Sequence, residues 1–426
     1  MPLRALPSAG RPHRGSVQFE FLTFKLYNPG MARPVRRTVR DHLLRLARKF
    51  PVVTVTGPRQ SGKTTLCRGA FPDLPYATLE DPDTRAHATR DPRGFLAGFP
   101  AGAVLDEVQR VPDLLSYLQG IVDAAPRRAR FVLSGSQHFG LLGSVTQSLA
   151  GRTALLNLMP FDRGEMRRVR GAAALDLWET LFRGGYPAIH DRRASPGDWL
   201  AGYTATYLER DVRQVLNVGD LGAFQDFLRL CAGRAGQVLN LAALGADAGV
   251  SHTTARAWLT VLEAGFLVFR LRPLHRNLRK RITRAPKLAF WDSGLLCYLL
   301  GIRTPAELRI HSARGAVFEC WVASEIAKHR LHRGIAADLH YFRDHRGTEV
   351  DAVLDTGTRI AAVESKSGAT VPEDPIRVLR GFAATTAIDP RCPRAELFLV
   401  HGGEAAGTRE GVRIVPWSAV DRIDWR

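Results

Sequence analysis

Nine consecutive residues near the start of the chain have the types and spacing needed to bind a nucleoside triphosphate. They are Gly57, Pro58, Arg59, Gln60, Ser61, Gly62, Lys63, Thr64 and Thr65. Glycines at both ends of the loop allow a tight turn whose backbone N–H groups point at the β-phosphate. Lys63 would reach the β- and γ-phosphates, and the Thr64 hydroxyl would bind Mg²⁺. The segment therefore predicts a site for ATP and Mg²⁺; because no residue in it reads the base, GTP or another nucleotide is an alternative.

Two carboxylates further along the chain could complete the chemistry of such a site. Asp106 and Glu107 follow the apolar run 103–105. Asp106 would hold the Mg²⁺ ion, often through water, and Glu107 would polarise the water that attacks the γ-phosphate. Two ionised neighbours at a strand end are costly without a cation, although an ordinary acidic pair that ends a strand is the alternative. The pair therefore points to nucleotide hydrolysis.

Two further residues are candidates for contact with the γ-phosphate. Ser136 follows the run 130–133, where its hydroxyl could contact the γ-phosphate or the attacking water. Arg152 could offer its charge to a nucleotide bound by a neighbouring subunit, which would require a homo-oligomer. A plain loop serine and a solvated arginine are the alternatives. Both residues are predicted as catalytic, together with Lys63 and Glu107.

These groups can meet only if the strands that precede them end at the same edge of a sheet. The runs 52–55, 103–105 and 130–133 are rich in apolar and β-branched residues, which is typical of strands buried in a parallel sheet. Apolar residues recur at helical spacing over 38–50, which predicts an amphipathic helix packed on this core. The expected fold class is α/β, with a P-loop NTPase parallel sheet.

The pattern along the chain suggests an order of domains. A P-loop domain is expected over residues 31–165, and the helical spacing that follows predicts a helical lid or linker over 166–232. Residues 1–30 are rich in Pro, Gly and Arg, and are expected to be a disordered basic tail or an over-long start. A transit-like role for this tail is an alternative.

A helix-turn-helix pattern is present in the middle of the chain. A short apolar helix at 241–244 is followed by a turn at Gly249 and by Ser251, a typical N-cap for a second helix. The alternating run that follows could form a β-wing. A winged helix is therefore expected over 233–275, where Arg256 is suited to phosphate contact more than to base readout. A protein-interaction module is the alternative.

A second group of charged residues lies in the last third of the chain. Asp351 lies in one predicted strand, and Glu364 and Lys366 alternate along the next. Side chains two apart on a strand share a face, so these three can converge, and Glu319 in a predicted helix could add a third acidic ligand. Such a cluster can hold a divalent metal and orient water against a phosphodiester. A purely structural salt bridge between the lysine and the glutamate is the alternative.

The segment around this second group is expected to form a C-terminal α/β domain. Strands are predicted at 349–354 and 360–366, and a helix at 316–326. The expected organisation is a basic linker over 276–312, followed by a nuclease-like domain over 313–426.

The overall charge of the chain indicates an anionic partner. The 426 residues carry a formal net charge of +19, which favours DNA as the partner. The basic residues gather in patches at 33–48, 127–130, 163–170 and 275–287. A coding bias toward arginine, combined with ordinary surface solvation, is the alternative.

Other features of the composition restrict the class of protein. The chain has no run of about eighteen apolar residues, so no membrane-spanning helix and no membrane partner are predicted. Its five cysteines are scattered, odd in number and without metal-ligand spacing. Such cysteines are typical of reduced thiols, which predicts a cytoplasmic protein.

Several motifs in a fixed order resemble those of prokaryotic AAA-type P-loop ATPases that carry a C-terminal domain of unknown function. The motifs are GPRQSGKTTL, LDEVQRVPDL, SGSQ, LAGR, YLERDV, RITRAPKLAFWDSGLLCYLLGI, GAVFECWVASEI, YFRDHRGTEVDAVL and VESKSG, and the resemblance covers roughly residues 39–368. The resemblance implies ATP binding and hydrolysis, a winged helix and a restriction-endonuclease-like core. It assigns the nucleotide chemistry to Lys63, Thr64, Asp106 and Glu107.

In the C-terminal part, the same resemblance assigns the metal site to Asp351, Glu364 and Lys366. One position departs from the family pattern, because Ser365 stands where a hydrophobic residue is expected between the glutamate and the lysine. Its side chain should face away from the metal, since neighbouring residues of a strand point to opposite faces. The departure therefore changes the assignment only slightly.

Two functions stay open. The first is an ATP-hydrolysing protein that acts on or with DNA, with or without cleavage by the second site. The second is an ATP-dependent switch that regulates a protein partner and carries an inactive nuclease-like domain. Stimulation of ATP turnover by DNA would separate the two.

Overall fold

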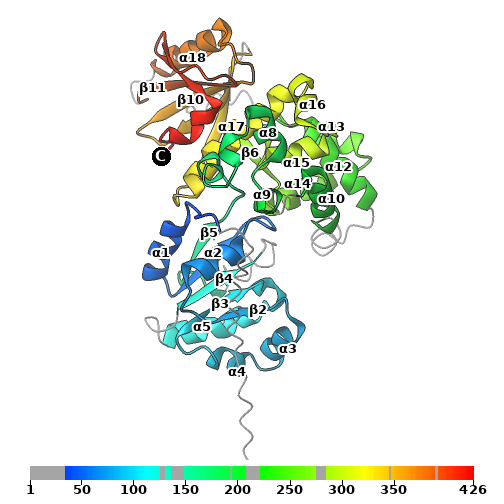
Figure 1. Cartoon of the computed structure of the whole chain (residues 1–426), viewed down its shortest axis with the longest axis vertical. Coiled ribbons are helices and arrows are strands. Elements are labelled where there is room, and N and C mark those ends of the chain that lie inside the picture. Colours follow the sequence, from blue (N-terminus) through cyan, green and yellow to red (C-terminus); the bar gives the residue numbers. More distant parts are fainter. Residues whose placement is uncertain are drawn as a thin grey trace, which may run out of the picture. The chain divides into compact units, whose positions relative to one another are not determined.

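The computed structural model describes residues 34–124, 130–135, 148–191, 194–207, 221–274, 285–344, 347–388 and 392–426. Within it, Val35–Arg426 forms one compact unit (Figure 1). The predictions for the N-terminal tail, for Ser136 and for most of the basic patch 275–287 fall outside the described residues. In the described part, no helix has both the length and the apolar character to cross a membrane.

The first sheet has five strands in the order β2-β3-β4-β1-β5, and all its neighbouring strands are parallel. The strands are β1 (Val52–Thr56), β2 (Tyr76–Thr78), β3 (Gly102–Asp106), β4 (Arg130–Ser134) and β5 (Thr153–Asn157). The predicted strands at 52–55, 103–105 and 130–133 are confirmed. Because the strands are parallel, the loops that follow β1 and β3 lie at the same edge of the sheet.

The two faces of this sheet pack against different helices. Val53 and Val55 lie in a buried cluster with Leu43 of α1 and Leu66 of α2, whereas Leu105 lies in another cluster with α5. The helices are α1 (Arg40–Lys49), α2 (Lys63–Ala70), α3 (Pro82–Arg90), α4 (Pro92–Ala97) and α5 (Leu114–Ala124), with a short 3-10 helix at Val108–Arg110. The predicted amphipathic helix is confirmed as α1, which buries Leu43 completely.

A helical region follows the first sheet. Its helices are α7 (Arg163–Met166), a 3-10 helix at Ala172–Ala174, α8 (Leu177–Arg183), α9 (Pro187–Asp191), α10 (Pro196–Tyr207) and α12 (Leu221–Gly233). Tyr186, Trp199 and Tyr203 pack their rings together, with centroids 5.0–5.2 Å apart. These aromatic residues therefore belong to the core of the region.

The predicted helix-turn-helix is present as α13 (Leu241–Asp247) and α14 (His252–Ala264). The predicted N-cap is confirmed, because the Ser251 side chain accepts a hydrogen bond from the backbone N–H of Thr254 at 3.1 Å. The strand expected as a wing is β6 (Val268–Pro273), which pairs with β7 (Lys287–Phe290) and with β8 (Leu339–Arg343). This strand is therefore part of a larger sheet.

The second sheet has eight strands in the order β12-β13-β11-β10-β9-β8-β6-β7. Its remaining strands are β9 (Glu349–Asp355), β10 (Ile360–Lys366), β11 (Ala395–His401), β12 (Gly407–Arg409) and β13 (Val412–Pro416). Helix α17 (Arg314–Leu331) packs on one face of the sheet, next to Ala352 and Val363. Helix α18 (Glu373–Thr386) packs on the other face, next to Val353 and Ala362. A 3-10 helix follows at Trp417–Arg422.

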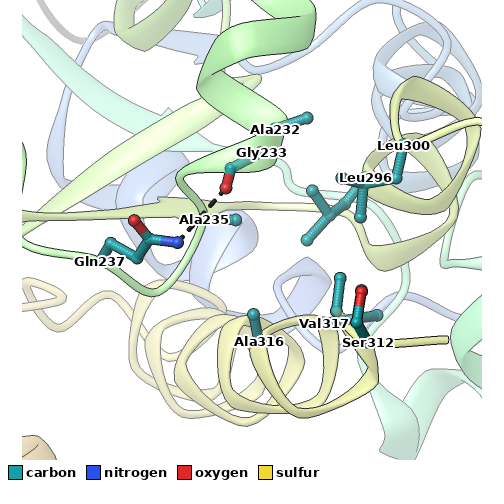
Figure 2. Close-up of a pocket in the computed structure, with 10 residues that line it drawn as sticks. Ala232, Gly233, Ala235, Gln237, Leu296, Leu300, Ser312, Ala316 and Val317 are labelled. Atoms are coloured by element: carbon teal, nitrogen blue, oxygen red, sulfur yellow. Dashed lines mark hydrogen bonds between the residues drawn. The ribbon is translucent and has the colours of Figure 1, made fainter. Parts of the chain in front are cut away.

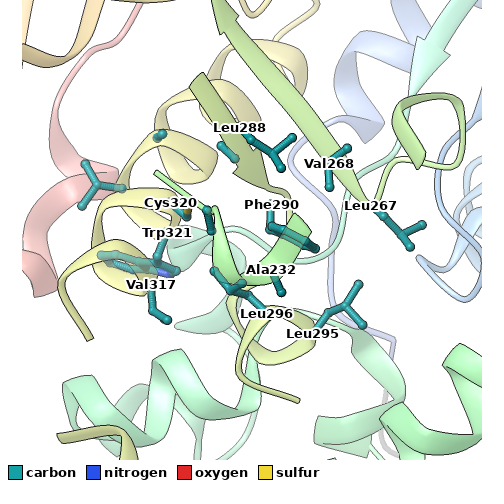
Figure 3. Packing of buried hydrophobic residues seen from close by; sticks show 14 of the residues in the cluster. Ala232, Leu267, Val268, Leu288, Phe290, Leu295, Leu296, Val317, Cys320 and Trp321 are labelled. Atoms are coloured by element: carbon teal, nitrogen blue, oxygen red, sulfur yellow. The ribbon is translucent and has the colours of Figure 1, made fainter. Parts of the chain in front are cut away.

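The basic linker expected over 276–312 is wrong from residue 285 onward. That stretch forms β7, α15 (Ser293–Leu299) and α16 (Pro305–Ile310). Leu288, Phe290, Leu295 and Leu296 lie in one buried cluster with residues of α17 (Figure 3). The physical reason is that burying these apolar side chains is more favourable than exposing them to water in a linker.

Candidate nucleotide-binding site and a second charged cluster

The loop over residues 57–62 joins β1 to α2 and has the backbone that its glycines predict. Gly57 has a φ of 145° and Gly62 a φ of 94°, both in the region that side chains rarely adopt. A Cβ atom on Gly57 would lie 2.2 Å from the backbone oxygen of Leu158. Gln60, between the two glycines, also has a positive φ, of 58°. Thr65 lies in the first turn of α2, and its side chain is exposed. The close approach of residue 158 therefore requires glycine at position 57.

Lys63 lies inside this loop. Its Nζ atom donates to the backbone oxygens of Gly57 at 3.1 Å and of Pro58 at 2.8 Å. Burial lowers the pKa of the Lys63 ammonium to about 8, and the carboxylates of Glu107 and Asp106 oppose the shift. Lys63 is thus a buried cation that the loop itself holds in place.

Asp106 lies at the end of β3 and accepts hydrogen bonds from three hydroxyl groups. Thr64 and Tyr76 donate to Oδ2 at 2.7 and 3.0 Å, and Ser134 donates to Oδ1 at 2.5 Å. The parallel register that pairs Asp106 with Ser134 explains the last contact. Thr64 and Asp106 therefore lie close enough to bind one cation. The sequence analysis missed Tyr76, because it did not identify the short strand β2.

Glu107 stands next to Asp106 in a left-handed backbone conformation, with a φ of 57°. Such a conformation costs on the order of 1–3 kcal/mol for a residue with a side chain, and it often marks a functional position. Its carboxylate accepts a hydrogen bond from the Gln109 amide. The position therefore fits a residue whose side chain must point in one particular direction.

Arg152 lies at the other end of the sheet from the loop. It directly precedes β5, and its backbone oxygen accepts from the N–H of Val52 at the start of β1. Five strand residues separate the two edges, a distance of about 16 Å. Its guanidinium pairs with Asp123 through Nε at 2.5 Å and Nη2 at 2.8 Å. Arg152 therefore does not lie at the nucleotide loop of its own chain.

Arg37 contacts the nucleotide loop, although the sequence placed it in a basic surface patch. Its side chain is only 6% exposed. Nη1 donates to the backbone oxygen of Ser61 at 2.7 Å, and Nη2 donates to that of Met159 at 2.5 Å. Its Nε atom lies 3.1 Å from Oε1 of the buried Glu165. Arg37 therefore braces the loop from inside the protein, and its inclusion in a basic surface patch is wrong.

The second charged cluster lies on β7, β9, β10 and α17. Lys366 Nζ lies 3.4 Å from Glu364 Oε2, and the Ser365 N–H donates to Asp351 Oδ2 at 2.9 Å. Lys287 Nζ lies 2.8 Å from Glu319 Oε1 and 3.8 Å from Asp351 Oδ1. The structure thus brings the four predicted residues into one region, together with Lys287.

Lys287 and Glu349 are the residues of this cluster that the sequence analysis did not assign to it. Lys287 was counted in a basic surface patch, yet its side chain is 2% exposed and also pairs with Glu349. A lysine at the start of the fully buried strand β7 was the available signal. Placing Lys287 on the surface is therefore wrong, because the nearby carboxylates stabilise its charge inside the protein.

Burial dominates the electrostatics of the cluster. It raises the pKa of both Glu319 and Glu364 to about 8, and the nearby Asp351 carboxylate adds to the shift. Burial also raises the pKa of Asp351, against the opposing effects of Lys287 and Lys366. A cation would stabilise the ionised forms of these carboxylates. The cluster therefore has the donor chemistry for a divalent metal.

A cavity of about 260 Å³ lies between the end of α12, α15 and the start of α17 (Figure 2). Ala235, Gln237 and Ala316 line it, together with other apolar residues and Ser312. Gly236 lies between two of these lining residues, and a Cβ atom on it would lie 3.3 Å from Glu319 Oε2. Gly236 therefore lies beside the Glu319 carboxylate of the charged cluster.

Comparisons with known proteins match most of the chain. Residues 49–167 match an AAA domain, residues 174–306 match a domain of unknown function (DUF8612), and residues 314–420 match another domain of unknown function (DUF4143). The uncharacterized proteins Rv2008c of Mycobacterium tuberculosis and Mb2031c of Mycobacterium bovis are each 34% identical to this chain over 339 residues. The alignments cover 79% of this chain and 74% of each relative. The chain belongs to this family of AAA-type ATPases.

The predicted fold class is confirmed for this AAA-type family member: an α/β P-loop NTPase sheet, a helical region and a C-terminal α/β sheet domain. Solved structures similar to it include the Walker-type ATPase paby2304 of Pyrococcus abyssi, with a TM-score of 0.38, 15% identity, and coverage of 61% of this chain and 94% of that chain. Another is RuvB of Thermotoga maritima, with a TM-score of 0.29, 18% identity, and coverage of 55% of this chain and 88% of that chain.

A third charged group in this AAA-type protein joins α7 to α17. Among the described residues, Asp162, Glu165 and His332 place three ligand-type atoms within 4.8 Å of one another. Asp162 Oδ2 lies 2.8 Å from His332 Nδ1, and Glu165 accepts from the N–H of Thr38 at 2.7 Å. Burial would raise the pKa of Asp162, but the interactions with His332, the hydrogen bond from the Glu165 N–H and the charge of Arg37 together outweigh it and hold the pKa below the usual range. Since protein donors already occupy these carboxylates, the group is structural.

Replacing Arg37 by alanine is expected to lower the free energy of unfolding by about 3–5 kcal/mol, because it leaves the Glu165 carboxylate buried without its partner. Urea denaturation of the nucleotide-free protein would measure the loss. Arg36→Ala is the matched control, since Arg36 forms an exposed ion pair with Asp41 and should cost less than about 1 kcal/mol. Equal losses in the two variants would contradict the role of Arg37.

The stability of the protein should fall in mildly acidic solution because of His329 on α17. Burial lowers the pKa of its imidazole to about 4 from an ordinary 6.5, and Arg333 adds to the shift. Between these values the unfolded chain binds the proton and the folded chain does not, so stability present above pH 6.5 is lost as the pH falls toward 4.

The expected loss from this one group is about 2 kcal/mol at pH 5 relative to pH 7.5. Urea unfolding of the wild type and of His329→Gln at the two pH values would measure it. The variant should lose less stability than the wild type over this range. Identical losses would exclude His329 as the source.

Proposed function

We propose that the protein binds ATP with Mg²⁺ at residues 57–65 and hydrolyses it. The observation that supports this most is the arrangement at the edge of the first sheet. Lys63 is buried inside the loop, and the Thr64 hydroxyl donates to Asp106 Oδ2 at 2.7 Å. Hydroxyl and carboxylate oxygens on these two elements are the ligands that nucleotide-bound Mg²⁺ takes in P-loop proteins.

Each residue of the site has a distinct role in this proposal. The backbone N–H groups of residues 57–62 and the Lys63 ammonium bind the phosphates, while Thr64 and Asp106 hold Mg²⁺. Glu107 orients the water that attacks the γ-phosphate. Ser136, which lies outside the described residues, would contact the γ-phosphate or that water. Arg152 would act on a nucleotide of a neighbouring subunit in a homo-oligomer.

The partner we propose for this ATPase is DNA. The support is the net charge of +19 and the exposed Arg256 near the start of α14. In this proposal residues 31–165 are the ATPase domain, 166–232 a lid, 233–275 a winged helix, and 313–426 a nuclease-like domain. Asp351, Glu364 and Lys366 would provide its metal chemistry.

Measuring ATP turnover with and without DNA tests the proposal. Turnover that rises with DNA, and that Lys63→Ala removes, is the expected result. If adding DNA left ATP turnover unchanged, the proposal that this ATPase acts on or with DNA would be excluded. In a binding assay, replacing Arg276, Arg279, Lys280 and Arg281 by alanine should lower DNA affinity and its salt dependence; these residues lie outside the described part of the chain.

A second candidate function is an ATP-dependent switch that regulates a protein partner. The observation that favours it is the Lys287 ammonium among the carboxylates of the second cluster. A lysine there neutralises part of the carboxylate charge without any metal, which suits an inactive nuclease-like domain. Metal-dependent nicking of DNA that Asp351→Ala abolishes would exclude this candidate.

A further inference from the structure

Lys287 is fixed in the second charged cluster by its backbone as well as by its charge. As the first residue of β7 it pairs with Leu271 of β6 on one side, and it forms an isolated bridge with Val238 on the other. Its ammonium lies 2.8 Å from Glu319 Oε1 and also contacts Glu349 Oε1. Withdrawing this side chain would break ion pairs in a buried place, so Lys287 is a permanent cation of the cluster.

Glu319 and Glu349 are the carboxylates that balance Lys287. Glu319 is further confined by Gly236, on which an added Cβ would lie 3.3 Å from the Oε2 atom of Glu319. Among the described residues, the oxygens of Glu319, Asp351 and Glu364 do not all lie within 4.8 Å of one another. In this arrangement, Glu319 therefore pairs with Lys287 and does not share an ion with Asp351 and Glu364.

Glu364 has an oxygen atom that protein groups leave free. Glu364 is 4% exposed. Its Oε2 atom lies 3.4 Å from Lys366, whereas its Oε1 atom is buried and has no hydrogen-bond partner among the described residues. Asp351 lies close by, because its Oδ2 atom accepts a hydrogen bond at 2.9 Å from the N–H of Ser365, the residue that follows Glu364 in β10. A buried carboxylate oxygen without a donor is costly, and a cation beside Asp351 would satisfy it.

We propose that Lys287 serves as a built-in cation that removes Glu319 and Glu349 from the metal site, so that the cluster holds one divalent cation, between Asp351 and Glu364. The proposal rests on the metal chemistry suggested above for the nuclease-like domain, and it adds the number of ions and the role of Lys287. The metal, when bound, would polarise a phosphodiester and its attacking water.

The charge balance of the cluster supports a single ion. Four carboxylates, those of Glu319, Glu349, Asp351 and Glu364, face the two ammonium groups of Lys287 and Lys366. A third cation is Arg343, whose Nη1 atom lies 3.6 Å from Glu349 Oε2. When all these groups are ionised, one negative charge remains, so a single divalent cation comes closest to neutralising the cluster. A second divalent cation would leave a large excess of positive charge beside a buried ammonium. Lys287 thus takes the position that a second metal occupies in two-metal sites.

Mn²⁺ binding to the full-length, nucleotide-free protein tests the proposal, with free Mn²⁺ measured by electron paramagnetic resonance. The wild type should bind a Mn²⁺ ion that Asp351→Asn and Glu364→Gln each eliminate. Glu319→Gln should weaken this binding by about tenfold or less, because Glu319 is not a ligand. The proposal would be overturned if Glu319→Gln no longer bound the ion. It would also be overturned if Asp351→Asn bound as much Mn²⁺ as the wild type.

Lys287→Met provides a second arm of the same experiment. The variant should gain a second Mn²⁺ ion, and Mn²⁺ should raise its melting temperature more than that of the wild type. Lys328→Met is the matched control, since Lys328 is another buried lysine paired with a glutamate, and it should gain none. A folded Lys287→Met that binds no additional ion would refute the role of Lys287.

If Lys287→Met does not fold, the comparison of the wild type with Asp351→Asn, Glu364→Gln and Glu319→Gln decides alone. These measurements use neither nucleotide nor DNA. A single Mn²⁺ ion without any nicking of DNA would therefore reject nuclease activity and leave the proposed metal site standing. Metal-dependent nicking of DNA that requires Glu319 as a metal ligand would support nuclease activity and reject the proposed metal site.

Discussion

Lys63→Ala is expected to lower ATP affinity by about ten- to a hundredfold, the value of a hydrogen bond to a charged group. Turnover should fall by about 10²–10³-fold, because the ammonium also stabilises charge that develops on the phosphates during hydrolysis. The reason lies in the loop, where Lys63 Nζ is held by the backbone oxygens of Gly57 and Pro58. No other lysine of the described chain is held within that loop. Calorimetry and a phosphate-release assay would measure the two effects.

The control for this variant is Lys49→Ala, because Lys49 is exposed in the last turn of α1. It should bind and hydrolyse ATP as the wild type does. The melting temperature of Lys63→Ala without nucleotide should show whether the variant is folded. A folded Lys63→Ala protein with wild-type turnover would contradict the assignment of the nucleotide site.

Glu107→Gln is expected to separate ATP binding from hydrolysis. Removing the carboxylate that polarises the water should lower turnover by about 10²–10⁴-fold. The phosphate and Mg²⁺ contacts come from Lys63, Thr64 and Asp106, so ATP affinity should stay within about threefold of the wild type, less than the effect of one hydrogen bond. Single-turnover kinetics together with equilibrium binding of ATP would show the difference.

A suitable control is Glu373→Gln, which changes an exposed glutamate at the start of α18. Its turnover should match that of the wild type. If Glu107→Gln lost ATP binding to the same extent as turnover, Glu107 would be a residue of the binding site. Unchanged turnover would show that another group activates the water.

The backbone geometry of the candidate nucleotide site was largely predictable because its residues are adjacent in the sequence. A strand, a glycine-bounded turn and Lys63 follow one another within a few positions, and such local patterns fix backbone geometry directly. Asp106 was predictable for a related reason, since it ends a second apolar run. Tyr76 was not, because its strand has three residues and leaves almost no periodicity to read.

The buried charges were the part that the sequence could not reveal. Arg37 and Lys287 stand among other basic residues, and a count of charge along the chain places both on the surface. Each is stabilised by carboxylates distant in sequence, Arg37 by Glu165 and Lys287 by Glu319 and Glu349. Burial of a charge depends on such partners, so only the fold could identify these two residues as internal.

The eight-stranded sheet has a consequence for how this protein can be divided experimentally. Its strands β6 and β7 lie within residues 174–306, which match one family, whereas β8 to β13 lie within residues 314–420, which match another. A fragment that contained only the second region would expose the edge of β8 where β6 normally pairs. Unpaired strand edges promote aggregation. We therefore expect the two regions to stay soluble when expressed together and to aggregate when expressed apart.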